Sequence, residues 1–170
     1  PPTLAAAELR YLGGLAGLRS LAHVEANRLF ADAKAVEAME VMLDWVFFAR
    51  QIADRETATE KAWGMRAVAL GLEHMRDLAY QDFQAQSRAL TPSAITEIIR
   101  RLDDKRGPLG ISRLMLPRAD RIAVDQILHR VYDQSTRQTT DQYGPTMARV
   151  TSRERPLRLF SEAARWDMIR

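Results

Sequence analysis

Apolar residues recur at helical spacing along most of the chain, and the first run predicts a helix over residues 3–30. Its apolar positions lie three residues apart, at Leu9, Leu12, Leu15, Leu18, Leu21 and Val24. Gly13, Gly14 and Gly17 interrupt this run, and each glycine costs about 1 kcal/mol relative to alanine inside a helix. Either Gly13 and Gly17 form a ridge that lets another helix approach closely, or the helix kinks or breaks at Gly13-Gly14. The first interpretation makes Gly13 and Gly17 candidate interface residues.

The second run, residues 32–53, predicts a helix that is apolar on more than one side. One line follows Val36, Met39, Leu43 and Val46, and a second follows Val41, Trp45, Phe48 and Ile52. So wide an apolar surface is typical of the central helix of a bundle, or of a helix that meets another subunit. We therefore predict that this helix is the most buried element, and we take Trp45, Phe48 and Ile52 as further candidate interface residues. Glu37, Glu40 and Asp44 mark its solvated face.

Two capping signals place the next helices. Thr57 and Glu60 have the spacing of a capping box, which predicts a helix from residue 58 to about residue 87. Thr91-Pro92 is typical of an N-cap followed by proline at the first helical position. It predicts a fourth helix that buries Ile95, Ile98, Ile99 and Leu102.

The last third of the chain is less regular. Residues 111–116 are compatible with a short strand or a helical turn, and residues 118–136 predict a fifth helix. Residues 138–155 are rich in Thr, Gln and Arg and predict a polar loop or extended arm, after which Pro156 can start a short helix. The predicted fold is all-α: an irregular bundle of five to six helices over residues 1–137, an arm over 138–155 and a C-terminal helix over 156–170 that packs on the bundle or on a partner.

Composition excludes several kinds of chemistry. The chain has no cysteine, so it has neither disulfides nor thiolate metal sites. Its histidines, His23, His74 and His129, fall on three different predicted helices without a ligand or catalytic motif around them. We therefore expect no catalytic residue, no cofactor and no metal site, and we expect that the protein is not an enzyme.

The sequence also bears on membranes and compartment. The longest apolar stretch, residues 41–49, contains Asp44 and is far shorter than the roughly 20 residues of a membrane-spanning helix. No transmembrane segment is therefore predicted. The sequence starts at Pro1 without an initiator methionine, so we expect that an N-terminal segment was removed or lies outside it. No localisation is assigned.

Charge is distributed unevenly along the chain. Residues 1–90 carry 10 basic and 12 acidic side chains, whereas residues 91–170 carry 15 basic and 10 acidic ones. Within the basic half, residues 85–102 place Ala85, Leu90, Ile95 and Ile98 where a helix-turn-helix motif has a small residue and three buried ones. The segment resembles the recognition helix of helix-turn-helix regulators, although Gln84 and Arg88 replace apolar residues of that motif. The resemblance implies nucleic-acid contacts from Ser93, Thr96, Arg100, Arg101 and Arg106.

Two functions follow from these patterns. The preferred hypothesis is a non-catalytic helical subunit or adaptor of a larger protein assembly, with other subunits or a second copy of the chain as its partner. The alternative is a DNA-binding transcriptional regulator that uses residues 84–102, with the N-terminal helices as its dimerisation surface. The wide apolar surface favours the first, and the basic C-terminal half favours the second.

Overall fold

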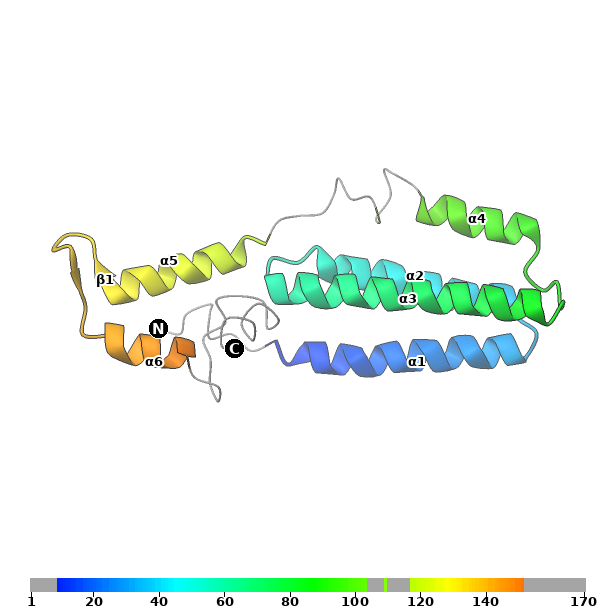
Figure 1. Ribbon diagram of the computed structural model, residues 1–170, viewed down its shortest axis with the longest axis horizontal. Coiled ribbons are helices and arrows are strands. Elements are labelled where there is room, and N and C mark those ends of the chain that lie inside the picture. Colours follow the sequence, from blue (N-terminus) through cyan, green and yellow to red (C-terminus); the bar gives the residue numbers. More distant parts are fainter. Residues whose placement is uncertain (1–8, 104–108, 110–116, 152–170) are drawn as a thin grey trace. The chain divides into compact units, whose positions relative to one another are not determined.

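A computed structural model describes residues 9–103, residue 109 and residues 117–151, and within them the chain is almost entirely helical. The described part contains six helices and one two-stranded hairpin, so the predicted all-α fold is confirmed (Figure 1). The chain divides into two compact units. One, the helical unit, comprises residues 10–55 and 62–115; the other, the hairpin unit, comprises residues 1–9, 56–61 and 116–170.

The helical unit contains four helices that run along a common direction (Figure 1). They are α1 (Tyr11–Ala31), α2 (Ala35–Ala53), α3 (Ala58–Gln84), whose first turn belongs to the hairpin unit, and α4 (Pro92–Leu102). A tight turn joins α1 to α2: the Lys34 amide donates to the Leu29 carbonyl at 2.9 Å, and the Ala33 amide donates to the Phe30 carbonyl at 3.0 Å. This pair of bonds is a Schellman motif, with Ala33 in the left-handed position that glycine usually fills.

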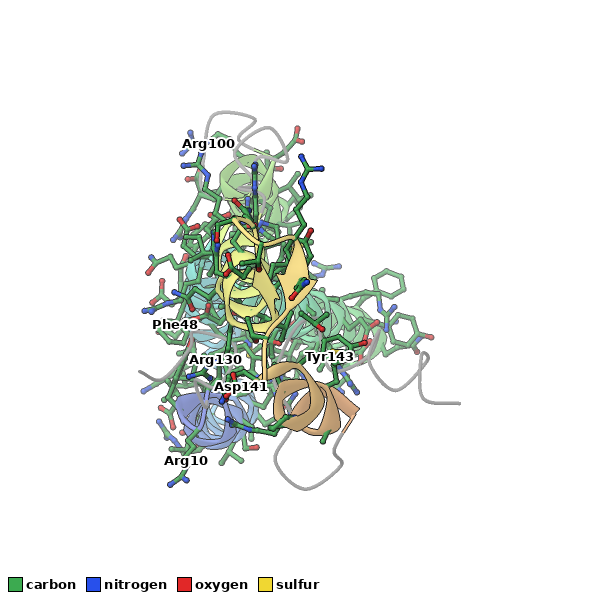
Figure 2. All side chains as sticks on the ribbon, turned by 90° about the vertical axis from the view of Figure 1, so that its left-hand side faces the viewer. Arg10, Phe48, Arg100, Arg130, Asp141 and Tyr143 are labelled. Atoms are coloured by element: carbon green, nitrogen blue, oxygen red, sulfur yellow. The ribbon has the colours of Figure 1, made fainter. Side chains whose placement is uncertain are left out.

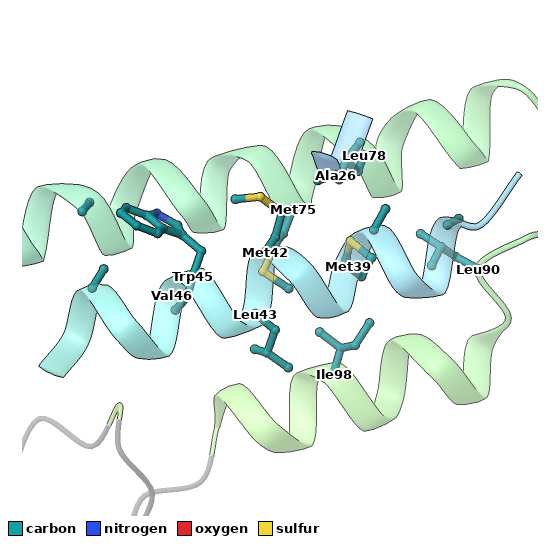
Figure 3. Close-up of a cluster of buried hydrophobic side chains, with 14 residues drawn as sticks. Ala26, Met39, Met42, Leu43, Trp45, Val46, Met75, Leu78, Leu90 and Ile98 are labelled. Carbon is teal, nitrogen blue, oxygen red and sulfur yellow. The ribbon is translucent and has the colours of Figure 1, made fainter. Parts of the chain in front are cut away.

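The core of the helical unit is centred on α2, which confirms the prediction that this is the most buried helix. Figure 3 shows Leu43 of α2 facing Ile98 of α4, and Met42 beside Met75 of α3. Met42, Leu43 and Val46 are fully buried, as is Leu78 of α3. Apart from Val36, which is exposed, the two apolar lines that the sequence places on this helix therefore point into the protein's own interior.

The connection between α3 and α4 is held by one buried carboxylate. Asp82, 5 % exposed, accepts hydrogen bonds from the Ser87 hydroxyl and, at 3.2 Å, from the Leu90 amide. Thr91 then caps α4 by accepting a hydrogen bond from the Ala94 amide at 3.2 Å, with Pro92 in the first turn. The predicted start of this helix is confirmed. Of the four residues predicted to be buried, Ile98 is buried and Leu102 is half-buried, whereas Ile95 and Ile99 are exposed because they lie on the side of α4 that faces away from α2.

The hairpin unit begins with the predicted capping box, which the structure confirms. The Thr57 hydroxyl accepts a hydrogen bond from the Glu60 amide at 3.1 Å, and the Glu60 carboxylate accepts one from the Thr57 amide at 3.3 Å. The Ala58 amide donates to the Asp120 carboxylate at 2.6 Å, and the Ala119 amide donates to the Glu56 carbonyl at 3.1 Å. These two bonds tie the first turn of α3 to the start of α5.

Residues after position 131 differ from the sequence prediction. Helix α5 (Ala119–Val131) ends five residues before the predicted residue 136, because β1 (Tyr132–Asp133) pairs antiparallel with β2 (Gln138–Thr139). Asp133 shapes the turn between them by accepting hydrogen bonds from the Ser135 amide and hydroxyl. Helix α6 (Tyr143–Thr151) follows. The predicted polar arm is therefore wrong for residues 138–151, where local hydrogen bonds organise a polar sequence.

The predicted domain limits also differ from the structure. Residues 1–137 were expected to form one bundle, whereas α5 belongs to the hairpin unit. The predicted strand or turn over residues 111–116 and the predicted helix from Pro156 onward lie outside the described residues.

Candidate interaction surface

Helix α1 has a second face that none of the other described helices covers. Leu12 and Ala26 face the interior, while an exposed line of residues recurs at alternating spacings of four and three on the other side. Leu21 and Val24, at its centre, are 66 % and 64 % exposed. We call this the outer line of α1, and it consists of Arg10, Gly14, Gly17, Leu21, Val24, Arg28 and Ala31. Spacings of four and three are those by which one helix packs along another.

The glycines of α1 lie on this open side. A Cβ atom added at Gly13, Gly14 or Gly17 would meet no other atom within 4 Å. The helix continues through Gly13-Gly14, so the alternative of a break there is wrong. A ridge for close helix approach stays a prediction, and none of the described helices fills it.

The glycines that do serve helix packing lie in α3. A Cβ atom at Gly64 would be 2.7 Å from the Ala53 Cα and 2.8 Å from the Ala49 carbonyl oxygen, and one at Gly71 would be 2.7 Å from a Val46 methyl group. Sequence reasoning did not single these residues out. The available signal was their seven-residue spacing, which places both on the same helical face as buried Ala67.

Helix α3 carries a second open apolar line. It consists of Met65, Ala69, Leu72, Arg76 and Phe83, all exposed, and we call it the outer line of α3. Phe83 is 75 % exposed, and the neighbouring Tyr80 is 61 % exposed. The opposite face of this helix contains Trp63, Ala67, Leu70, His74 and Leu78, all buried or half-buried.

The three interface candidates of α2 lie in different surroundings from the glycines of α1. Trp45 and Ile52 are each 4 % exposed, and Phe48 is half-buried. The Trp45 ring lies 5.7 Å from that of Phe48 and 6.2 Å from that of Trp63, between ring centroids. Trp45 and Ile52 are therefore core residues, out of reach of a partner in this fold. Gly13 and Gly17 are the two interface candidates that lie on an open surface.

The nucleic-acid candidates on α4 differ in how accessible they are. Ser93, Thr96 and Arg100 are exposed, and Figure 2 shows Arg100 pointing away from the helix. Arg100 forms an ion pair with Glu97 on the same helix. Arg101 instead reaches Glu40 of α2 with two bonds, at 2.6 and 2.8 Å, and lies 5.9 Å from the ring of Phe47. Arg106 lies outside the described residues.

Two histidines from separate predicted helices meet between α1 and α3. The rings of His23 and His74 stack with their centroids 4.4 Å apart, and the Nε2 atom of each is buried without a hydrogen-bond partner. Burial lowers the pKa of both imidazoles. The charges of His74 and Arg19 lower the pKa of His23 further. The Asp77 carboxylate acts in the opposite direction on the pKa of His74. The pair is therefore neutral in the folded protein at neutral pH. The sequence did not predict this contact, because the two histidines are 51 positions apart in the chain and lie on different predicted helices.

Other classes of site have little support in the described residues. Among them, no three His, Asp or Glu side chains converge in a way that could hold a metal ion. None of the described helices is both long and apolar enough to cross a bilayer. A comparison of the chain with protein-family models, with curated proteins and with solved structures finds no match.

Proposed function

We propose that this protein is a non-catalytic helical subunit or adaptor that binds other proteins through the outer faces of α1 and α3. The observation that carries the proposal is the exposure of large apolar side chains along both helices, outside the core that the chain builds for itself. Leu21, Val24, Tyr80 and Phe83 are each more than 60 % exposed.

The free energy of burying apolar side chains favours a partner that covers these faces. Burying a leucine, valine or phenylalanine side chain fully contributes about 1.5–3 kcal/mol relative to leaving it in water. Single exposed apolar residues are common on protein surfaces, whereas apolar residues that follow one another along a helix are typical of interaction sites. Met65, Ala69 and Leu72 follow one another in this way on α3, and Leu21 and Val24 do so at the centre of the outer line of α1.

The test is the composition of the native particle. We expect the tagged chain, purified from its source cells, to retain a stoichiometric protein partner that a Tyr80→Ser/Phe83→Ser double variant loses. Gln51→Ser, at an exposed position of α2, is the matched control and should retain the partner. Recovery of the wild-type chain alone, at its monomer mass, would contradict the proposal.

DNA binding through α4 is the second candidate function. It is favoured by the exposure of Ser93, Thr96 and Arg100 on one side of a capped helix in the basic half of the chain. The pairing of Arg101 with Glu40 weighs against it, because a guanidinium held by a carboxylate is less available to phosphate. The adaptor function is therefore preferred.

A further inference from the structure

We infer that α1 is released from α3 when the pH falls, because the stacked pair of His23 and His74 at their contact accommodates neutral rings and not charged ones. The inference concerns how one helix is held and does not depend on the proposed function. Three features carry it: the surroundings of the two rings, the charges near them and the few residues that hold α1 in place.

The two imidazole rings have no acceptor for an added proton. Their centroids lie 4.4 Å apart, and among the described residues neither buried Nε2 atom has a hydrogen-bond partner. Both ring nitrogens of a protonated imidazole are donors, so protonation would leave a buried Nε2–H unpaired beside a second positive charge. A buried charge without a partner is strongly unfavourable. The contact between α1 and α3 is therefore compatible only with neutral rings.

The charged groups nearest the pair do not compensate for protonation. Arg19 of α1 adds a positive charge and lowers the pKa of His23. Asp77 of α3 acts in the opposite direction on the pKa of His74, but it is exposed and shared with Arg76, 2.8 Å away. Once α1 is released, both rings meet water and bind protons near the ordinary pKa of about 6.5. The docked helix is therefore favoured above this pH and loses stability as the pH falls below it.

Helix α2, which also packs on α1, supplies no compensating carboxylate. Glu40 pairs with α4, and Arg50 pairs with Asp54 on its own helix. Glu37 and Asp44 are exposed. None of these groups is among the charges that shift the pKa of either ring.

Helix α1 is held by far fewer buried residues than α2. Of its 21 residues only Leu12 and Ala26 are buried, whereas Met42, Leu43 and Val46 are among those that make α2 the centre of the core. The three glycines of α1 also lower its helix propensity. A loss of favourable contact with α3 therefore affects α1 before the rest of the helical unit.

The contact between α2 and α3 has no comparable dependence on pH. The two helices approach closely at Gly64 and Gly71, whose neighbours are backbone atoms of α2 and the side chains of Val46 and Trp45. The turn at the end of α1 is likewise held by backbone hydrogen bonds. We therefore expect α1 to swing away about this turn while α2 and α3 stay together.

Distances between spin labels test the release, and the absence of native cysteine confines the labels to introduced ones. Ser20→Cys/Gln81→Cys reports on α1 and α3, and Gln51→Cys/Gln81→Cys reports on α2 and α3; all three positions are exposed. Double electron–electron resonance at pH 7.5 should give one narrow distance for each pair. At pH 5 the first pair should gain a longer distance, whose population rises roughly tenfold or more because the released state binds additional protons. An unchanged first pair, or equal changes in both pairs, would overturn the inference.

Variants of the labelled chain show whether the two histidines are responsible. His23→Phe/His74→Phe keeps two stacked rings that do not titrate, so α1 should stay docked at pH 5. His23→Gln/His74→Gln should do the same, and circular dichroism checks that each variant is folded. His129→Phe, at an exposed position of α5, is the matched control and should respond to pH like the wild type. Release at pH 5 in a folded chain that lacks both His23 and His74 would contradict the inference.

The neighbouring charges provide a readout that packing alone would not move. Arg19→Gln removes a charge that opposes protonation of His23, so the pH of half-release should fall. Asp77→Asn removes the carboxylate that favours protonation of His74, so the pH of half-release should rise. Shifts in the same direction, or no shift in either variant, would show that protonation of the pair does not control α1.

Discussion

At the scale of single residues, the glycines of this chain have two different roles that look alike in the sequence. Gly64 lies against the backbone of α2 at Ala49 and Ala53, whereas Gly17 has open space beside it. We predict that Gly64→Ala lowers the free energy of unfolding by about 1–3 kcal/mol, because its Cβ would overlap atoms that cannot move independently. Gly17→Ala should instead raise it by about 1 kcal/mol, since alanine favours the helix and meets nothing. Urea unfolding of both variants checks this, and equal effects would contradict the packing described.

The stacked histidines predict a pH dependence of stability. The pKa of His23 and that of His74 are lowered in the folded protein, so the unfolded chain binds protons first as the pH falls. Stability is therefore fully present above the unfolded pKa of about 6.5 and is lost as the pH falls below it. We expect the free energy of unfolding to decrease from pH 7 to pH 5, and His23→Phe/His74→Phe, which keeps two stacked rings, to flatten this decrease. Urea unfolding at pH 7, 6 and 5 measures it; an unchanged slope in the variant would assign the effect to other groups.

At the scale of elements, α4 is held on α2 by apolar packing and one half-exposed ion pair. Arg101 donates to both oxygens of Glu40 and lies over Phe47, so Arg101→Ala removes an ion pair and a cation–π contact. We expect a loss of about 1 kcal/mol, the upper range for a solvent-accessible pair. Arg100→Ala is the matched control on the same helix, and its exposed pair with Glu97 should contribute less than about 0.5 kcal/mol.

Hydrogen exchange of the α4 amides measures the docking of this helix directly. Exchange should become faster in Arg101→Ala and stay near the wild-type rate in Arg100→Ala. If both variants exchange alike, the contact with Glu40 does not contribute to holding α4.

At the scale of the whole molecule, the uneven charge separates the two candidate functions. The basic half supplies attraction to phosphate without a preferred sequence, and such binding weakens steeply as salt is raised. We expect weak binding of labelled duplexes at low salt, near loss at physiological salt, and no change in sequence preference for Ser93→Ala/Thr96→Ala. A random-sequence duplex is the control. Specific binding at physiological salt that depends on Ser93 and Thr96 would place DNA recognition ahead of the adaptor function.

The sequence by itself determined the features that depend on neighbours in the chain. The capping box of Thr57 and Glu60 and the cap of Thr91 are hydrogen bonds between residues three positions apart, so the local pattern is sufficient to predict them. The two apolar lines of α2 likewise required its burial, since no other helix among the described residues carries so wide an apolar surface.

Only the tertiary structure decided which apolar faces stay open and which residues meet across helices. Whether a glycine faces solvent or a backbone depends on the helix beside it, so Gly17 and Gly64 could not be distinguished beforehand. From the sequence alone Trp45 was a candidate interface residue, whereas in the fold α3 covers it. His23 meets His74 only because α1 and α3 pack together. Periodicity gives the faces of each helix, but the fold determines which face is left for a partner.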